Sequence, residues 1–363
     1  MDGMRKHEKT RVYLYIDVIG GGGAERVMAN LANALSVDGY DTTLITAYRV
    51  ENEYALHEGV GRFVLEEPEI QQSRLRRNVS RIAKLRRICR KGKPDILISF
   101  MAESNFRAIL ATRFLHVKTL VSVRNDPIRE YPGKLGAFVG KFILPMADGC
   151  VFQTKDAQKW FPHRLQKKSR VIYNAVKDDF YHIERATIND EIVTCGRLVE
   201  QKNHSLLIDA FSEVRKKRPE ATLRIYGEGI LHERLQRKID ELGLSQSVFL
   251  MGTTNDVGKA LSTADLFVLS SDYEGMPNAL MEAMAMGLPC VSTDCPCGGP
   301  KELFGEELQR NLSKCGDSKQ LARLIFGRLS EKEAGEEEKK RAALFKPQMV
   351  NAEWEEYIES IIK

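Results

Sequence analysis

The chain has 363 residues, of which 43% are hydrophobic and 29% charged, and its formal net charge is +5. This length predicts two globular domains, and the composition excludes a low-complexity or disordered chain. No apolar run approaches the ~18 residues of a membrane span. The N-terminal MDGMRKHEKT shows no apolar signal core, and seven scattered cysteines fit reduced thiols, so we expect a cytoplasmic protein.

Strand and helix patterns alternate along the whole chain. In the first half, strands are predicted at residues 11–19, 42–47, 95–100, 118–123 and 149–154, with helices at 24–37 and 74–93 and between the later strands. After a segment at 170–176 the alternation restarts, with strands at 192–195, 221–227, 248–251, 266–269 and 290–293. Such alternation predicts mostly parallel sheets covered by helices. We therefore expect an α/β protein with two Rossmann-like domains, 1–174 and 175–345, followed by a helix at about 346–363.

The predicted helix at 74–93 is unusually basic. It holds ten Lys or Arg residues and no acid, and without them the chain would carry a net charge of −5. Surface helices normally mix charges of both signs, so a plain solvated helix is the weaker of two interpretations. One face is apolar and is formed by Leu75, Val79, Ile82, Leu85 and Cys89.

An anionic partner is the stronger interpretation of this helix. An anionic membrane surface contributes about 1 kcal/mol per cation, and a lipid diphosphate would offer similar chemistry. Nucleic acid is disfavoured because no aromatic residues interleave with the cations. We expect the apolar face to pack on the first domain. The membrane or the acceptor would then contact Arg77, Arg81, Lys84 and Arg87.

Four glycines, Gly20–Gly23, follow the first strand and open a helix. Glycine lets the backbone approach a ligand closely, and a helix N-terminus favours a phosphate. The spacing fits neither the dinucleotide-binding fingerprint nor a P-loop. A flexible turn is the alternative, since a glycine run by itself is a weak signal.

Two cations follow the first strand of the second domain, in the string GRLVEQKN. Arg197 offers a planar fork and Lys202 a point charge. Fixed cations of this kind stabilise the negative charge that develops on a leaving diphosphate. Either cation alone would be an ordinary surface residue.

Two acids in the segment SSDYEGMPNALMEAMAMGLP, Glu274 and Glu282, are the most informative residues of the chain. Glu274 stands in a turn after a strand, Pro277 suits the first helical position, and Glu282 lies about two helical turns further on. The turn combines a carboxylate with unpaired N–H groups at a helix N-terminus. This predicts a ligand with both hydroxyl groups and phosphate, the alternative being two solvent-facing acids on an ordinary helix.

The strings GGGGAERV, GRLVEQKNHSLLIDAF and EGMPNALMEAMAMGLP together resemble the signatures of family 4 glycosyltransferases. That resemblance implies the GT-B fold, in which two Rossmann-like domains face each other across a cleft. It further implies an N-terminal domain that binds the acceptor, completed by the terminal helix, and a C-terminal domain that binds the nucleotide sugar. Members of this family retain the configuration of the transferred sugar and usually need no metal or other cofactor.

The resemblance also implies roles for individual residues. Glu274, Arg197 and Lys202 would be catalytic, with Glu274 on the sugar, Glu282 on the ribose and the cations on the diphosphate. Arg124 and Asn125 stand where related enzymes often have a histidine; they are candidates for contacting sugar or acceptor, and a capping turn is an equal alternative. Further substrate-binding residues would be Gly21, Gly22, Gly23, Asn174, Gly252, Thr253, Gly275, Met276, Pro277, Asn278 and Ala279.

These observations together predict a retaining glycosyltransferase. The expected donor is a UDP-hexose or UDP-N-acetylhexosamine, and the expected acceptor is a polyprenyl-diphosphate-linked glycan. The string DCPCGGP supports this because it resembles a loop of family members that build bacterial polysaccharides and glycolipids, and its Gly298 and Gly299 would permit close approach of a ligand. The protein would then lie on the inner face of the cell membrane. A soluble acceptor and a non-catalytic nucleotide-sugar or lipid-binding protein are the alternatives. The cysteines at 290–297 match no zinc spacing, so we expect no metal site.

Overall fold

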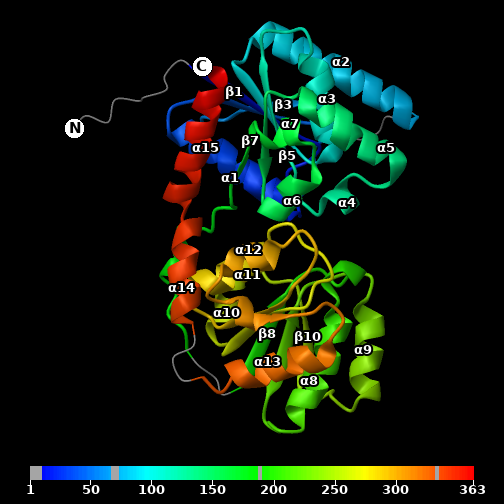
Figure 1. The fold of residues 1–363 in the computed structure, drawn as a ribbon, viewed down its shortest axis with the longest axis vertical. Helices are drawn as coiled ribbons and strands as arrows, with labels where there is room; N and C mark the ends of the chain where they lie inside the picture. The colour runs from blue at the N-terminus through cyan, green and yellow to red at the C-terminus, as the bar shows by residue number, and fades with distance from the viewer. Residues whose placement is uncertain (1–9, 67–72, 187–189, 332–334) are drawn as a thin grey trace, which may run out of the picture. The chain divides into compact units, whose positions relative to one another are not determined.

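The computed structural model describes residues 10–66, 73–186, 190–331 and 335–363. The chain divides into two compact units (Figure 1). The first runs to Tyr173 and also contains Gln348–Lys363, and the second is Asn174–Pro347. Each unit is built around its own parallel β-sheet, which confirms the predicted pair of α/β domains.

The sheet of the first unit has the strand order β3-β2-β1-β4-β5-β6-β7, and all its pairs are parallel. Because chain order reverses between β1 and β4, ligands are expected beyond the carboxyl ends of these two strands. The strands are β1 Arg11–Ile16, β2 Asp41–Thr46, β3 Gly61–Val64, β4 Ile96–Phe100, β5 Lys118–Ser122, β6 Gly149–Phe152 and β7 Ser169–Val171.

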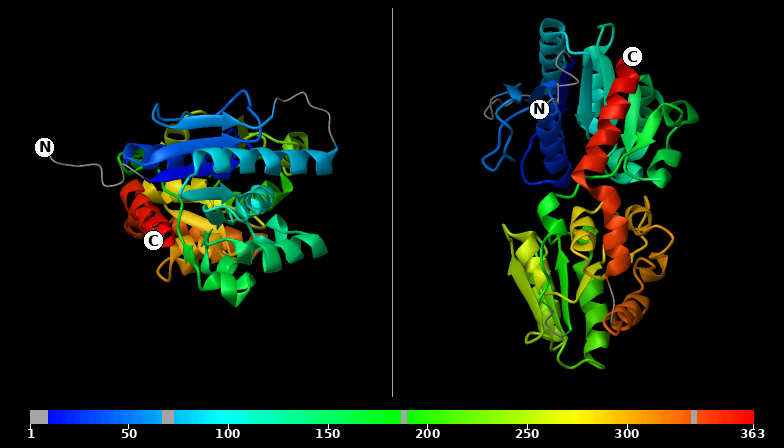
Figure 2. Two further views of the ribbon diagram at one scale, coloured as in Figure 1. Left: turned by 90° about the horizontal axis from the view of Figure 1, so that it is seen from above. Right: turned by 90° about the vertical axis from the view of Figure 1, so that its left-hand side faces the viewer.

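Helices cover both faces of this sheet (Figure 2). The last helix returns to the first unit, where the Trp354 ring stacks on Phe100 with 5.8 Å between centroids. The Tyr357 hydroxyl donates to the Lys168 carbonyl at 2.6 Å and accepts from the Cys150 N–H at 3.0 Å. The helical segments are α1 Gly23–Val37, α2 Arg74–Gly92, α3 Ala102–Thr112, α4 Pro127–Glu130, α5 Gly133–Phe138, η1 Val139–Ile143, η2 Leu144–Met146, α6 Lys155–Trp160, α7 His163–Gln166 and α15 Pro347–Ile362.

Only the second half of α2 packs as the sequence predicts. Leu85 and Cys89 are fully buried in a cluster that also holds Tyr15. Leu75 and Val79 are 76% and 59% exposed, so the prediction that the whole apolar face is packed is wrong for the first turns. The helix extends beyond the sheet at its N-terminal end (Figure 1).

The second unit has the strand order β10-β9-β8-β11-β12-β13, again all parallel, with the reversal between β8 and β11. Its strands are β8 Glu191–Cys195, β9 Thr222–Tyr226, β10 Val248–Gly252, β11 Leu266–Leu269, β12 Cys290–Thr293 and β13 Leu312–Ser313. Its helical segments are η3 Asp178–Tyr181, η4 Glu200–Lys202, α8 His204–Arg215, α9 His232–Glu241, α10 Val257–Ser262, α11 Asn278–Ala285, α12 Gly299–Phe304, η5 Gln309–Asn311, α13 Ser318–Arg328, α14 Glu336–Ala342 and η6 Ala343–Phe345.

All seven cysteines lie in the described part of the chain, and none of them forms a disulfide. Among the described residues, no helix combines the length and the apolar character needed to cross a bilayer.

Candidate functional site

Two of the predicted site residues meet where chain order reverses in the second unit. Lys202 ends the short helix η4 after β8, and Glu274 lies in the loop after β11. The Lys202 Nζ and Glu274 Oε1 atoms are 2.5 Å apart, and Ser271 Oγ donates to the same oxygen at 2.7 Å. The two side chains are 17% and 8% exposed. This charge pair is therefore fixed and mostly shielded from water, which strengthens its field.

The loops that carry this pair are joined by several hydrogen bonds. The Asp272 N–H donates to the Gln201 carbonyl and the Gln201 amide to the Tyr273 carbonyl, both at 2.9 Å. Asn203 Nδ2 donates to Asp272 Oδ1 at 2.8 Å. These bonds hold the loop after β8 against the loop after β11, so the positions of Lys202 and Glu274 depend on one another.

The turn that precedes α11 is also held in place. Asn174 is buried, and its amide nitrogen donates to Asn278 Oδ1 at 2.7 Å and to the Met276 carbonyl at 3.5 Å. The structure thus places Asn174 as a support of the predicted substrate turn. The helix itself begins at Asn278, with Pro277 as its N-cap rather than its first residue.

Gly299 presses against the same turn. A Cβ atom at this position would lie 1.9 Å from the Gly275 carbonyl oxygen, so only glycine fits. Its neighbour Gly298 has a positive φ of +67°. The string DCPCGGP therefore supports the turn by close backbone packing, whereas the sequence predicts that Gly298 and Gly299 permit close approach of a ligand.

Glu282 lies in α11 and is 5% exposed. Burial, together with the charge of the Glu282 carboxylate, raises the pKa of the Cys195 thiol at the end of β8 to about 12. Likewise, burial and the charge of Glu274 raise the pKa of the Cys295 thiol. Both acids thus act on groups at the carboxyl ends of the strands, the edge at which ligands bind in such sheets.

Three glycines at this edge bring the strand ends close together. The Gly227 N–H donates to the Gly252 carbonyl at 2.8 Å, and a Cβ atom at Gly227 would lie 2.0 Å from the Gly196 carbonyl oxygen. Arg197 and Thr253, which follow two of these glycines, are both exposed. The edge therefore exposes backbone and one cation beside the Lys202–Glu274 pair.

In the first unit, the glycine loop connects β1 to α1. Gly21 has a φ of +77°, and a Cβ atom at Gly20 would lie 2.6 Å from the Asn52 carbonyl oxygen. The Tyr54 hydroxyl donates to the Gly22 carbonyl at 3.2 Å. Gly22 and Gly23 form the start of α1, so the predicted phosphate-binding residues stand at a helix N-terminus.

The loop Arg124–Asp126 follows β5 and is fixed by a residue that the sequence did not reveal. Glu130 Oε2 accepts the N–H groups of Arg124 at 2.9 Å and Asn125 at 2.8 Å. Burial raises the pKa of Glu130 to about 7, and burial lowers the pKa of Arg124 to about 10. The Arg124 guanidinium lies 4.6 Å from the centroid of the Phe100 ring.

Asp126 caps α4, with its carboxylate accepting from the Ile128 N–H at 3.1 Å. The capping turn that the sequence left as an alternative is thus present. Arg124 is buried and Asn125 is partly exposed, so of these two residues Asn125 offers its side chain to a ligand more readily.

Among the four cations of the basic helix that the sequence predicts to meet a membrane or acceptor, Arg81 is the one that is buried. Arg81 is only 5% exposed and its guanidinium pairs with Glu66 at 3.0 Å and Asp17 at 3.6 Å. The prediction that Arg81 faces a membrane or acceptor is therefore wrong. Lys84 donates to the Leu65 carbonyl at 2.7 Å, while Arg77 and Arg87 are exposed.

The sequence analysis missed Asp17, Glu130 and Ser271. Ser271 could have been suggested by its place just after a strand, whereas Asp17 fell inside the strand predicted at 11–19 and Glu130 ends α4. The roles of all three depend on partners that are distant in the chain or buried. Within the residues that the structure describes, no group of three or more His, Cys, Asp or Glu side chains could hold a metal ion.

The two parallel-sheet α/β units, each with a candidate site at its strand ends, have the architecture of the GT-B class. A family model described as Glycosyltransferase Family 4 matches residues 21–180, and one described as Glycosyl transferases group 1 matches residues 182–344. The chain belongs to the family 4 glycosyltransferases of GT-B fold.

Similar proteins include two curated relatives and a solved structure. An N-acetylgalactosamine-N,N'-diacetylbacillosaminyl-diphospho-undecaprenol 4-alpha-N-acetylgalactosaminyltransferase of Campylobacter jejuni is 28% identical over 83% of this chain and 84% of that protein. An uncharacterized glycosyltransferase of Methanocaldococcus jannaschii is 31% identical, over 63% of each chain. The structure of Anabaena HepE in complex with UDP and glucose superimposes with a TM-score of 0.77 over 97% of this chain and 100% of that one, at 17% identity.

Proposed function

We propose that this glycosyltransferase moves a hexose or N-acetylhexosamine from a UDP-sugar to a polyprenyl-diphosphate-linked glycan, with retention at the transferred carbon. The observation that carries the donor half is the shielded Lys202–Glu274 pair beside the N-terminus of α11. It combines a carboxylate for sugar hydroxyls with a cation and amide donors for a diphosphate. HepE, whose solved complexes contain UDP and UDP-glucose, supports UDP as the carrier.

In this proposal the charged groups have distinct roles toward the substrate. Glu274 accepts hydrogen bonds from sugar hydroxyls, and Glu282 binds the ribose. Lys202 and the exposed Arg197 neutralise the charge that develops on the leaving diphosphate, which they stabilise more in the transition state than in the ground state. The diphosphate oxygen takes the proton of the attacking hydroxyl, so attack and departure occur on one face of the sugar and its configuration is kept.

The acceptor half of the proposal rests on the first unit and on the relatives. The Campylobacter jejuni relative is named for a diphospho-undecaprenol acceptor and for an α-linked product. In this chain the glycine loop and the loop Arg124–Asn125 both lie at the carboxyl edge of the first sheet, where an acceptor would bind. We therefore assign acceptor binding to the first unit and donor binding to the second.

A transfer assay tests this function directly. Purified protein is given α-configured UDP-hexoses and UDP-N-acetylhexosamines, with GDP-mannose for comparison, and two forms of an N-acetylhexosamine disaccharide: polyprenyl-diphosphate-linked and free. We expect one UDP-sugar to raise the melting temperature and to be transferred to the lipid-linked disaccharide as an α-linked residue, as read from anomeric proton couplings. A β-linked product, or stabilisation by none of the UDP-sugars, would contradict the proposal.

A membrane-bound acceptor also requires contact with the lipid surface. The helical segments α2, α5 and η1 expose side chains that suit such a contact. The cations Arg76, Arg77 and Arg87 of α2 are exposed, as are Leu75 and Val79 in the first turns of the same helix. Alongside them, α5 and η1 expose Leu135, Phe138 and Phe142, which are 77%, 51% and 62% accessible. Both helices reach the same side of the first unit (Figures 1 and 2). Apolar side chains beside cations fit an anionic bilayer.

We predict that replacing Arg76, Arg77 and Arg87 with glutamine weakens binding to vesicles that contain phosphatidylglycerol. At about 1 kcal/mol per cation, partitioning should fall on the order of 100-fold. Replacing Phe138 and Phe142 with serine should weaken binding further, measured by co-sedimentation. The control is Phe114→Ser, at an aromatic residue of the same unit that is even more exposed, at 88%. Unchanged sedimentation of both variants would refute a membrane contact at this surface.

A further inference from the structure

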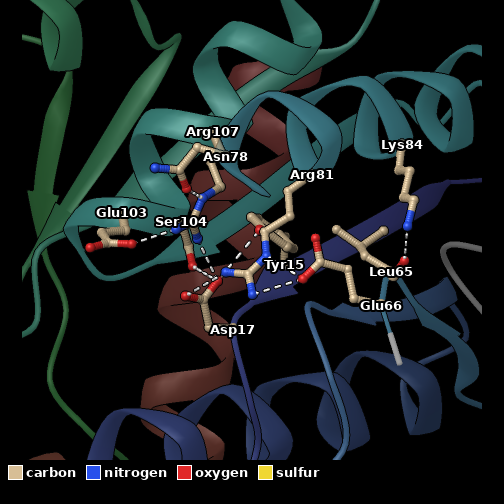
Figure 3. A network of polar contacts seen from close by, with 10 residues as sticks. All are labelled: Tyr15, Asp17, Leu65, Glu66, Asn78, Arg81, Lys84, Glu103, Ser104 and Arg107. Atoms are coloured by element: carbon tan, nitrogen blue, oxygen red, sulfur yellow. Dashed lines mark hydrogen bonds and ion pairs between the residues drawn. The ribbon is translucent and has the colours of Figure 1, made fainter. Parts of the chain in front are cut away.

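Asp17 occupies the point of the first unit where chain order reverses. It directly follows β1, and its side chain points toward the start of α3, which follows β4 (Figure 3). β1 and β4 are neighbours in the sheet. Asp17 thus stands beyond the carboxyl ends of the two strands at which an open parallel sheet binds its ligand.

The Asp17 carboxylate is held by donors from several elements. Arg107 Nη1 lies 2.6 Å and Ser104 Oγ 3.3 Å from Oδ1, and Arg81 Nη1 lies 3.6 Å from Oδ2. The Tyr15 hydroxyl is 3.5 Å from Oδ1. The Arg107 and Arg81 side chains are only 2% and 6% exposed, whereas that of Asp17 is 32% exposed. The guanidinium groups therefore lie on the interior side of Asp17, whose side chain reaches solvent.

The groups behind Asp17 are themselves fixed. Arg107 Nε donates to Asn78 Oδ1 at 2.9 Å, and another nitrogen of this guanidinium pairs with Glu103. Arg81 Nε donates to Glu66 Oε2 at 3.1 Å (Figure 3). This network fixes the orientation of the Asp17 carboxylate before a ligand binds, so binding costs little ordering energy.

The main chain of Asp17 is anchored as well. Its carbonyl accepts the N–H groups of Ala47 at 2.9 Å and Tyr48 at 3.3 Å, both just after β2. Asp17 is thus joined to the loop that follows β2, to helix α3 through Ser104 and Arg107, and to helix α2 through Arg81. Because these contacts fix its position, the partly exposed side chain of Asp17 presents its carboxylate oxygens in one direction.

We propose that Asp17 binds a hydroxyl group of the acceptor glycan. The inference rests on the proposed function and adds to it the residue that recognises the acceptor sugar. A carboxylate only accepts hydrogen bonds, so it suits a sugar hydroxyl and repels the phosphates of a lipid diphosphate. Arg81 and Arg107 are positioning residues that act through Asp17.

The test uses the lipid-linked disaccharide that the wild-type protein elongates, together with its monodeoxy analogues. In Asp17→Asn, kcat/KM for the full acceptor should fall about 10- to 100-fold, the range of a hydrogen bond to a charged group. The Kd for UDP should stay within about twofold. One deoxy acceptor should react equally slowly with wild type and with Asp17→Asn, because both lack the same hydrogen bond.

Asp41→Asn is the matched control. Asp41 is the first residue of β2, so it lies at the amino ends of the strands, whereas Asp17 lies at their carboxyl ends. It also pairs with an arginine, since Arg11 Nε lies 2.8 Å from its Oδ2. This variant should keep wild-type kinetics. If Asp17→Asn slows every deoxy acceptor by the same factor, the loss is structural and the inference is wrong; an unchanged kcat/KM also overturns it. A wild-type protein that elongates no acceptor would instead contradict the proposed function.

Discussion

Replacing Glu274 with alanine is expected to lower kcat for sugar transfer by about 10²–10³-fold, the usual loss when one preorganised charge is removed from a site. Glu274 Oε1 contacts both Lys202 and Ser271, so the carboxylate orients the cation as well as the sugar. Its loss would affect two tasks at once. Transfer rates at saturating donor and acceptor measure the effect.

Folding has to be separated from chemistry in this experiment. Alanine leaves the partly buried Lys202 without its counter-charge, which costs up to a few kcal/mol. Glu274→Gln keeps an oxygen for the Ser271 hydroxyl and serves as the second variant. The control is Glu200→Gln, in the same loop as Lys202, since the Glu200–Arg234 pair is 73% and 65% exposed. If Glu274→Gln transfers sugar at the wild-type rate, Glu274 merely holds Lys202.

The sequence was sufficient to predict the two parallel sheets, because long apolar runs alternate with amphipathic helices. Three strands escaped prediction. β3 has only four residues, which alternate between exposed and partly buried, while β7 has three and β13 has two, too few to show a pattern. All three lie at the edges of their sheets, where pairing depends on the neighbouring strand more than on the local residues.

For the site, local motifs predicted which residues stand at strand ends, but not which groups they contact. Lys202 and Glu274 are 72 positions apart, and Asp17 and Arg107 are 90 apart. Arg81 is an example of a residue whose partners could not be predicted from local motifs. By sequence it belongs to a basic helix surface, yet its counter-ions Glu66 and Asp17 come from other loops and draw it into the interior. Ion pairs between distant segments leave no periodic signal.

Replacing Glu130 with glutamine is expected to remove a pH dependence from the stability of the first unit. Burial raises the pKa of this carboxyl from 4.5 to about 7, although the N–H groups of Arg124 and Asn125 and the charge of Arg124 favour its ionised form. Because the folded pKa is the higher one, the folded state binds the proton more tightly. The resulting stabilisation is complete below about pH 4.5 and is lost as the pH rises through 7, with an upper limit of about 3 kcal/mol.

Glutamine cannot ionise but still accepts N–H groups, so Glu130→Gln should gain stability relative to wild type between pH 5 and 8. Urea unfolding followed by tryptophan fluorescence reports this unit alone, since Trp160 and Trp354 both belong to it. Glu356→Gln, at an exposed ion pair of the same unit, should follow the wild-type curve. Parallel curves for wild type and Glu130→Gln would contradict the prediction. Above pH 7 the ionised Glu130 binds the Arg124 and Asn125 N–H groups most strongly. The loop that we propose to meet the acceptor is then held in place, while the first unit is less stable than at low pH.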